Sequence, residues 1–313
     1  FYTSSGGTIP ARRQSRSAAQ SRTGGGTDAQ SHDLARDWSI VVAELHRLSL
    51  NTATIKQWSL KQCIEGCVRH GVTAIGAWRD KVQELGVDTA AKMINDNGLE
   101  VSALVRGGMF TAVDQAGRQA ALDENRRALE EAVAINAKCV VLVVGGLPDG
   151  SRDINDARQQ VRDGIAELLI HARACNMPLA IEPLHPMYAA DRACVNTLAH
   201  ANDLCEELGD GLGVAVDAYH VWWDPNLNHE IQRASGHILG FHVCDWLVPT
   251  TDMLLDRGMM GDGIIDLAAM NTMVVAAGYA GPIEVEIFSA ENWWKREGDD
   301  VMATVVERFE NVI

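Results

Sequence analysis

Eight short apolar runs, separated by amphipathic stretches, follow one another along the sequence from Leu48 onward. In the separating stretches 59–71, 124–137 and 156–176, apolar side chains recur at helical spacing, so these stretches are predicted to be helices. The apolar runs are predicted to be strands, and they span residues 48–55, 72–78, 99–105, 139–145, 178–183, 212–219, 238–246 and 282–288. The chain is therefore expected to alternate strands and helices throughout.

The composition of the runs indicates how the strands pack. A run such as VVLVVGG is too apolar for a strand with one face in water, which is typical of parallel strands covered on both sides. Gly71, Gly98 and Gly278 each precede a strand and predict where three helices end. Eight strand–helix pairs without a Gly-rich phosphate-binding motif favour an α/β fold of the closed (β/α)8, or TIM-barrel, type over an open doubly wound sheet.

The domain organisation follows from the length. A (β/α)8 barrel takes ~250 residues, and the chain has 313, so one barrel with an extension accounts for it. Residues 1–37 are rich in Ser, Gly, Gln and Arg and lack hydrophobic periodicity. We predict that they form a disordered N-terminal extension and that residues 38–313 form the barrel.

Charge and cysteine content exclude several classes of protein. A formal net charge of −15 disfavours binding to nucleic acid phosphates. No apolar run approaches the ~18 residues of a membrane-spanning helix. The seven cysteines are odd in number and show no CxxC spacing, so we expect them to be reduced. A cytoplasmic protein with no nucleic acid or membrane partner is predicted.

Four side chains of metal-binding type stand at or near the ends of four consecutive runs: Glu182, Asp217, His242 and Glu286. In a parallel barrel the carboxyl ends of the strands converge at one mouth, so these residues are predicted to share one ion. Three carboxylates and one imidazole suit a divalent cation such as Mn²⁺ or Mg²⁺. Glu284 faces the same side as Glu286, and either fits the pattern.

Loop residues near these positions are candidates for substrate binding. His185 and His220 each follow an acid by three residues, so they are expected above the metal as substrate contacts, further ligands or ordinary polar loop residues. Arg257 is predicted to bind an anionic or hydroxylated substrate. The Gly-rich segment GMMGDG, residues 258–263, is expected to be a flexible lid.

Aromatic and polar residues at other strand ends complete the candidates. Several tryptophans stand just beyond strand ends, and among them Trp223 and Trp246 are predicted to pack against a sugar ring, with capping of the core as the alternative. Asn51 ends the first run and Arg106 follows the third, so both are predicted to be polar groups of the pocket.

The motifs EPLHP, DxYH, HVxDW, RxxxGDG and GYxGxxxxEIF together resemble the xylose-isomerase-like TIM-barrel superfamily, in its sugar phosphate isomerase/epimerase branch. The resemblance covers about residues 48–313 and is most specific between Glu182 and Phe288. It implies that Glu182, Asp217, His242 and Glu286 hold one divalent ion, that Glu182 and Glu286 transfer protons, and that His220 and Arg257 contact substrate. It selects Glu286 over Glu284, and it makes a homo-oligomer or an accessory subunit plausible.

The expected chemistry is removal of the proton next to a ketose carbonyl. A ketose chelated by a divalent ion has this proton acidified, and one glutamate removes it while the other returns it to the opposite face. The predicted function is therefore metal-dependent isomerisation or epimerisation of a keto sugar or related polyol. Mn²⁺ is the expected ion, with Mg²⁺, Co²⁺ and Zn²⁺ as alternatives.

Other functions remain open at this stage. The same branch contains dehydratases and lyases that begin with the same proton abstraction, so elimination on a keto-cyclitol or 3-keto-glycoside is the main alternative. A non-catalytic sugar-binding barrel is another. The related abasic-site endonucleases would require further ligands for a zinc cluster and a basic surface, and neither is evident in the sequence.

Overall fold

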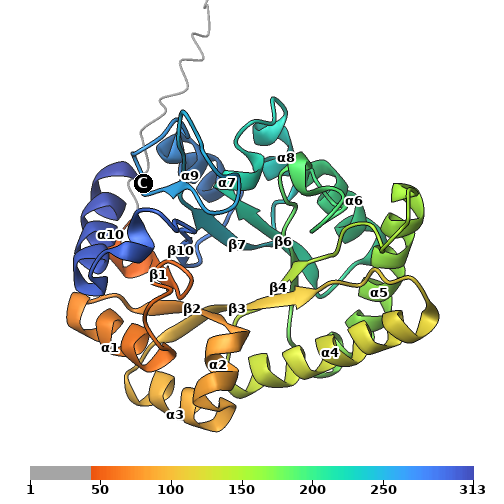
Figure 1. The fold of residues 1–313 in the computed structure, drawn as a ribbon, viewed down its shortest axis with the longest axis horizontal. Coiled ribbons are helices and arrows are strands. Elements are labelled where there is room, and N and C mark those ends of the chain that lie inside the picture. The colour runs from red at the N-terminus through yellow and green to blue at the C-terminus, as the bar shows by residue number, and fades with distance from the viewer. Residues whose placement is uncertain (1–43) are drawn as a thin grey trace, which may run out of the picture. The chain divides into compact units, whose positions relative to one another are not determined.

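The computed structural model describes residues 44–313 and shows a closed barrel of eight parallel strands in the order β1-β10-β7-β6-β5-β4-β3-β2 (Figure 1). The barrel strands are β1 (Leu48–Asn51), β2 (Ala74–Trp78), β3 (Glu100–Gly108), β4 (Val140–Val143), β5 (Leu179–Ile181), β6 (Leu212–Asp217), β7 (Ile238–Val243) and β10 (Ile283–Val285). Leu48 of β1 pairs with Ile283 of β10, which closes the barrel. The predicted (β/α)8 fold is confirmed, whereas the predicted extension 1–37 lies outside the described residues.

Helices surround the strands (Figure 1). They are α1 (Leu60–His70), α2 (Arg79–Leu85), α3 (Val87–Asp96), α4 (Gln115–Ala134), α5 (Ile154–Ala174), α6 (Leu198–Leu208), α7 (Ala218–Val221), α8 (Leu227–Arg233), α9 (Leu267–Ala276) and α10 (Gly298–Val312), with 3-10 turns η1 (Leu45–Arg47), η2 (Pro186–Tyr188) and η3 (Trp293–Lys295). Helix α1 begins at a capping box of Ser59 and Gln62 and ends at Gly71, whose φ of 71° is left-handed. The predicted helix end at Gly71 is thus confirmed.

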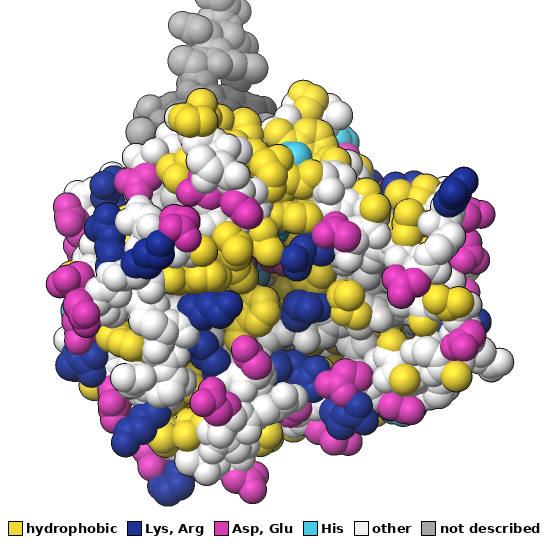
Figure 2. Space-filling view, viewed as in Figure 1, with side chains coloured by type: hydrophobic (Ala, Val, Ile, Leu, Met, Phe, Trp, Pro, Cys, Tyr) yellow, Lys and Arg dark blue, Asp and Glu magenta, His cyan; other side chains and the backbone are white. Residues whose placement is uncertain are grey.

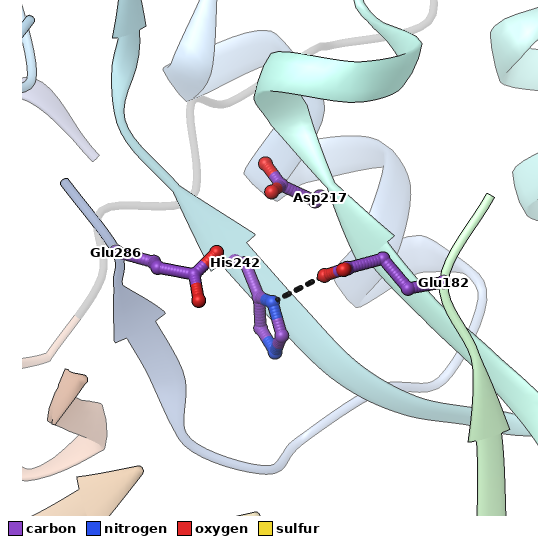
Figure 3. Close-up of side chains that lie close together, drawn as sticks. All are labelled: Glu182, Asp217, His242 and Glu286. Atoms are coloured by element: carbon purple, nitrogen blue, oxygen red, sulfur yellow. Dashed lines mark hydrogen bonds and ion pairs between the residues drawn. The ribbon is translucent and has the colours of Figure 1, made fainter. Parts of the chain in front are cut away.

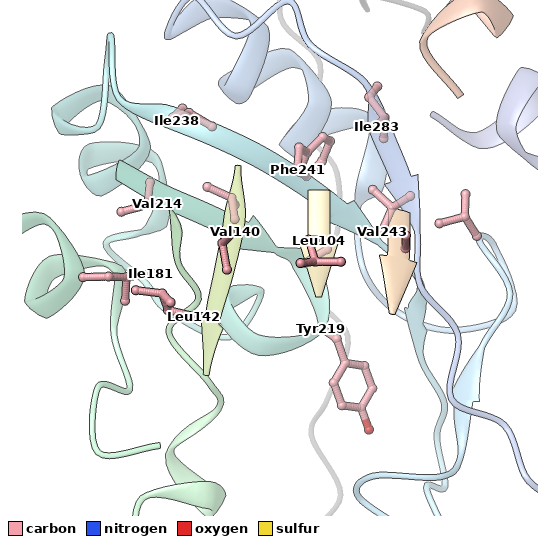
Figure 4. Close-up of a cluster of buried hydrophobic side chains, with 14 of the residues drawn as sticks. Leu104, Val140, Leu142, Ile181, Val214, Tyr219, Ile238, Phe241, Val243 and Ile283 are labelled. Atoms are coloured by element: carbon pink, nitrogen blue, oxygen red, sulfur yellow. The ribbon is translucent and has the colours of Figure 1, made fainter. Parts of the chain in front are cut away.

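Alternating strand residues build two apolar layers. Leu104, Val140 and Leu142 belong to the larger cluster, which includes helix residues and therefore lies between barrel and helices (Figure 4). Val105 and Val141 belong to a smaller cluster that includes no helix residue and fills the barrel interior. This alternation follows from the period of two along a strand, and it explains why the runs are apolar on both faces.

The segment after β7 differs from its prediction. The seventh run does not continue as one strand to residue 246, because β8 (Asp245–Trp246) turns away and pairs antiparallel with β9 (Arg257–Gly258). The carboxylate of Asp245 accepts backbone N–H groups of Gly261 and Gly263 at 2.9 and 2.8 Å. Met259 and Met260 are fully buried. The expectation of a flexible lid at 258–263 is therefore wrong, because a buried carboxylate and two buried side chains hold this segment.

None of the helices between residues 44 and 313 combines the length and the apolar character that a membrane crossing requires. All seven cysteines lie in the described part of the chain and are free thiols.

Candidate active site

Four predicted residues meet at the carboxyl ends of neighbouring strands (Figure 3). Asp217 ends β6 and pairs in register with His242 of β7, while Glu182 follows β5 and Glu286 follows β10. One ligand atom from each of the four lies within 4.8 Å of the others, and all four side chains are buried. The structure therefore brings together the residues that were expected to share one ion.

The donor set of this cluster fits a divalent cation. Three carboxylates and one imidazole converge with little access to water, and such a set suits ions from Mg²⁺ to Zn²⁺. Burial and the neighbouring carboxylates Glu182 and Asp217 raise the pKa of Glu286 to about 8, against the opposing effects of Arg257 and His242. A cation held between these groups would offset the crowding of buried negative charge.

His242 is the imidazole of the cluster. Its Nδ1 lies 3.0 Å from Oε1 of Glu182, the contact drawn as a dashed line in Figure 3. Burial lowers the pKa of His242, but the charge of Glu284 and the hydrogen bond with Glu182 outweigh this effect and raise the pKa to about 10. The protonated ring thus offsets part of the negative charge of the surrounding glutamates.

Arg257 lies against the cluster. It is 3% exposed, and its Nη1 lies 3.1 Å from Oδ2 of Asp217 and 3.3 Å from Oε2 of Glu286. Its Nη2 lies 3.2 Å from Nε2 of His220. Arg257 was predicted to contact substrate, and it does border the cavity described below, but its ion pairs are with two of the four clustered residues.

Asn51 lies behind the cluster. Its Nδ2 donates to Oε1 of Glu284 at 2.6 Å and to Oε1 of Glu286 at 3.0 Å, and its Oδ1 accepts from Nε1 of Trp78 at 2.9 Å. Asn51 is fully buried, so its prediction as a pocket residue is corrected. The physical reason is that β1 lies beside β10, whose carboxylates use both amide hydrogens of Asn51.

Glu284 and Glu286, which the sequence pattern did not distinguish, have different surroundings. Glu284 accepts a hydrogen bond from Ser102 Oγ at 2.5 Å and shares Asn51 with Glu286. Only Glu286 joins the group of ligand atoms and borders the cavity. The deeper position in the barrel thus belongs to Glu284, and the position at the mouth belongs to Glu286.

A cavity of about 430 Å³ opens next to the cluster, a size typical of small-molecule sites. Glu182 and Glu286 border it, as do the predicted substrate residues His220, Arg257 and Arg106. The other lining residues are Lys56, Trp78, Val105, Met109, Val143, Leu184, Tyr188, Asp191, Arg192, Leu254, Leu255, Phe288 and Trp294.

Besides Asn51, three further predicted substrate residues do not border this cavity. The ring of His185 packs against those of Trp223 and Trp246, with centroids 5.6 and 5.3 Å away. Trp246 also stacks on Tyr219 at 4.7 Å and is 9% exposed. The prediction that Trp223 and Trp246 form a sugar-binding wall is therefore corrected, because aromatic packing holds these rings together beside the cavity, and Trp246 caps the core.

A different aromatic group borders the cavity. Trp78 lies edge-on to Phe288 at 5.6 Å, and Phe288 lies edge-on to Trp294 at 5.9 Å. Trp78 and Trp294 are two of the several tryptophans that stand beyond strand ends, whereas no feature of the sequence singled out Phe288, Tyr188, Lys56 and Arg192. Phe288 was hidden in an apolar run, and the other three stand in loops with no distinguishing pattern.

Comparisons with known proteins agree with this architecture. The family model described as xylose isomerase-like TIM barrel matches residues 64–305. The crystal structure of protein SMc04130 from Sinorhizobium meliloti 1021 is 56% identical, has a TM-score of 0.85 and is matched over 86% of this chain and 99% of its own.

More distant proteins share the fold. D-psicose 3-epimerase from Clostridium cellulolyticum H10, solved with D-tagatose, is 14% identical, has a TM-score of 0.68 and is matched over 84% of this chain and 96% of its own. The IOLI protein with a bound zinc atom is 22% identical, with a TM-score of 0.74, over 85% of this chain and 97% of its own.

A curated relative was found by sequence. L-ribulose-5-phosphate 3-epimerase UlaE of Salmonella typhi is 27% identical over 183 residues, which is 57% of this chain. The chain spans 61% of the length of this epimerase.

Proposed function

The chain belongs to the xylose isomerase-like TIM-barrel family, and on this basis we propose that it is a metal-dependent epimerase or isomerase of a keto sugar. Sugar epimerases are among its relatives at low identity. The single observation that carries the proposal is that Glu182 and Glu286 border one cavity from β5 and β10, strands that β6 and β7 separate in the barrel. Two carboxylates that reach one cavity from different strands suit proton removal and proton return on opposite faces of a carbon.

The residues proposed to hold the metal are Glu182, Asp217, His242 and Glu286. When bound, a divalent cation would supply Lewis acidity to a ketose carbonyl and so acidify the adjacent C–H. Mn²⁺ is the ion we expect from the mixed carboxylate and imidazole donors.

The chain's own residues would perform the remaining tasks. One of Glu182 and Glu286 takes the proton next to the carbonyl, and the other delivers a proton to the opposite face. Asn51 holds Glu286 in place through the hydrogen bond at 3.0 Å. Trp78, Phe288 and Trp294 offer an apolar wall to the sugar ring, and His220 and Arg257 offer polar contacts from the other lining segments.

The proposal is tested by proton exchange. A panel of ketoses and ketose phosphates is incubated with Mn²⁺-loaded protein in D₂O, and deuterium at the carbon next to the carbonyl is measured by mass spectrometry and NMR. We expect exchange with inversion at that carbon, and Glu286→Gln should slow it about 10²- to 10⁴-fold. Glu310→Gln, at an exposed position on α10, is the matched control and should not change the rate.

Two results would contradict this function. Loss of water or of an aglycone from the substrate would identify elimination instead of epimerisation. Ligand binding without any exchange, unaffected by Glu286→Gln, would leave a sugar-binding barrel.

A further inference from the structure

We propose that Thr54 is a positioning residue of the active site, because its hydroxyl group fixes the backbone on both sides of Glu286 and so sets the place of that carboxylate. Thr54 is fully buried. Its Oγ1 donates to the carbonyl oxygen of Val285 at 2.8 Å and accepts from the N–H of Ile287 at 2.9 Å. The role rests on the proposed function, which makes Glu286 a metal ligand and a proton carrier, whereas the contacts themselves do not.

The hydroxyl group of Thr54 extends the connection between the first and the last barrel strand. The pairing of β1 with β10 ends at Leu50 and Val285. Beyond this pair the main chain of β1 turns, and the carbonyl oxygen of Asn51 accepts from the N–H of Thr54 at 3.0 Å. A buried N–H group needs an acceptor, and Ile287 finds it in a side chain instead of in the main chain of β1. Near the barrel mouth, one hydroxyl group therefore connects the two strands.

The position of Glu286 explains why this connection matters. Asp217 and His242 lie within β6 and β7 and pair with each other in register. Glu286 lies one residue beyond the end of β10 (Figure 3). On the side of β7 its N–H still donates to the carbonyl oxygen of Val243 at 3.1 Å. On the side of β1, the backbone around Glu286 is held by the hydroxyl group of Thr54.

The turn of residues 51–54, which is buried throughout, also holds part of the cavity wall. Oγ1 of Thr52 accepts from the N–H of Trp78 at 3.0 Å, and the carbonyl oxygen of Ala53 accepts from Nε1 of Trp294 at 2.8 Å. Both tryptophans border the cavity. The face shown in Figure 2 is hollowed near its centre, where hydrophobic and basic side chains gather. The turn thus links the apolar wall of the cavity to the carboxylate after β10.

The hydroxyl group can be removed or kept with little change of shape. It offers one donor and two acceptor lone pairs, and its donor and one lone pair are used here. Valine has the branched shape of threonine without the hydroxyl, so Thr54→Val leaves Val285 and Ile287 without their partner. Serine keeps the hydroxyl, so Thr54→Ser is the conservative variant.

The test measures Mn²⁺ binding to the chelator-treated full chain by titration calorimetry, without substrate. Thr54→Val should raise the dissociation constant for Mn²⁺ about 10- to 100-fold, which is typical for loss of a group that supports a metal ligand. Thr54→Ser should stay close to wild type. Asn202→Ala is the control for stability. Asn202 is fully buried and donates to two oxygens of Glu230, and neither residue borders the cavity. Its loss should therefore lower the urea midpoint and leave Mn²⁺ affinity unchanged.

The pattern across these variants decides the proposal. Weaker Mn²⁺ binding in Thr54→Val alone supports it. Unchanged binding in Thr54→Val overturns it. Equal weakening in Asn202→Ala overturns it by showing that general destabilisation is the cause, and equal weakening in Thr54→Ser overturns it by showing that the hydroxyl group is not the relevant feature. If Thr54→Val does not fold, Thr54→Ala removes the same hydroxyl group and takes its place in each comparison.

The role of Thr54 and the proposed function fail separately. The expected pattern of Mn²⁺ binding, without proton exchange on any ketose, would refute the epimerase function and leave Thr54 as the support of a metal ligand. A wild type that binds no Mn²⁺ would refute the metal site. Crystal structures of wild type and Thr54→Val would then decide, because separation of Glu286 from Asn51 in the variant supports the positioning role and an unmoved carboxylate overturns it.

Kinetics give a further readout where the wild type does exchange a ketose proton. At saturating Mn²⁺, Thr54→Val should lower kcat and leave KM unchanged, because it displaces a group that transfers protons and removes no substrate contact. A raised KM with unchanged kcat would contradict the positioning role.

Discussion

Nδ2 of Asn51 donates a 3.0 Å hydrogen bond to Oε1 of Glu286, so a residue on the first barrel strand positions a carboxylate that follows the last. The same amide group donates to Glu284 at 2.6 Å. Two buried carboxylates therefore depend on one neutral side chain. Its two hydrogens can serve both acids without adding charge to a crowded site.

The first prediction follows from this arrangement. Asn51→Ala should lower the free energy of unfolding by about 1–3 kcal/mol, because two buried acceptors lose their donor. Asn51→Asp should be more destabilising still, although it is nearly isosteric, because it places a third carboxylate beside two others. Urea denaturation measures both effects. Asn155→Ala, at an exposed position, is the control and should stay within about 0.5 kcal/mol of wild type. An Asn51→Ala variant as stable as wild type would show that the carboxylates do not rely on the amide.

The second prediction concerns metal binding. After removal of metal by chelator, added Mn²⁺ should raise the melting temperature, and the gain in stability is about 2.7 kcal/mol when Mn²⁺ is at 100 times its dissociation constant. Asp217→Asn should lose most of this increment, while Asp149→Asn, at an exposed position, should keep it. The increment is compared within each variant, because Asp217→Asn also breaks the ion pair with Arg257. Identical increments in the two variants would show that Asp217 is no ligand.

The third prediction concerns thiol reactivity. Cys175 is exposed and the other six cysteines are buried. Burial raises the pKa of Cys63 to about 11 and that of Cys205 to about 12, and only the thiolate reacts. Near neutral pH, a thiol reagent should therefore modify one cysteine of the native protein rapidly and all seven after denaturation. Cys175→Ser should abolish the rapid phase, and a rapid phase that persists would mean that a second thiol is accessible.

The fourth prediction concerns pH. Burial lowers the pKa of His200 below 6.5, with a further contribution from Arg158 and an opposing one from Asp203. The unfolded chain then binds more protons than the folded chain below about pH 6.5, so the free energy of unfolding should fall as the pH drops from 7 to 5. His200→Gln should make this fall smaller, and His229→Gln, at an exposed position, should not. Urea midpoints across this range test the prediction, and an unchanged slope in His200→Gln would refute it.

Much of the fold could be predicted because its signals are local. Seven of the eight barrel strands lie within their predicted apolar runs, whereas β3 continues three residues past the end of its run at residue 105. Helix α1 ends at Gly71 as expected. The convergence of Glu182, Asp217, His242 and Glu286 could also be predicted, because parallel strands of a barrel present their carboxyl ends at one mouth. The choice of Glu286 over Glu284 came from the resemblance of motifs, since both side chains face the same way along one strand.

The roles of loop residues could not be predicted because they depend on partners far away in sequence. The segment 258–263 looked flexible from its glycines, but Asp245 binds its backbone. His185 was expected to be a substrate contact, a further ligand or a polar loop residue, and its ring packs against Trp223 and Trp246. In both cases the deciding contact joins residues that no local pattern relates.

The barrel and the four residues that meet at its mouth could thus be predicted from the sequence alone. The spacing of apolar residues and the position of a residue at a strand end are both properties of short segments. The hydrogen-bond and ion-pair partners of those four residues were decided only by the tertiary structure. Asn51 donates a hydrogen bond to Glu286, which is 235 residues away in sequence, and Arg257 pairs with Asp217, which is 40 residues away. The folded structure also distinguishes two arginines that follow strand ends. Arg79 has two acidic partners, whereas Arg106 has none among the described residues. The reason is that burial, pairing and cavity shape depend on contacts between distant segments, which exist only once the barrel has closed.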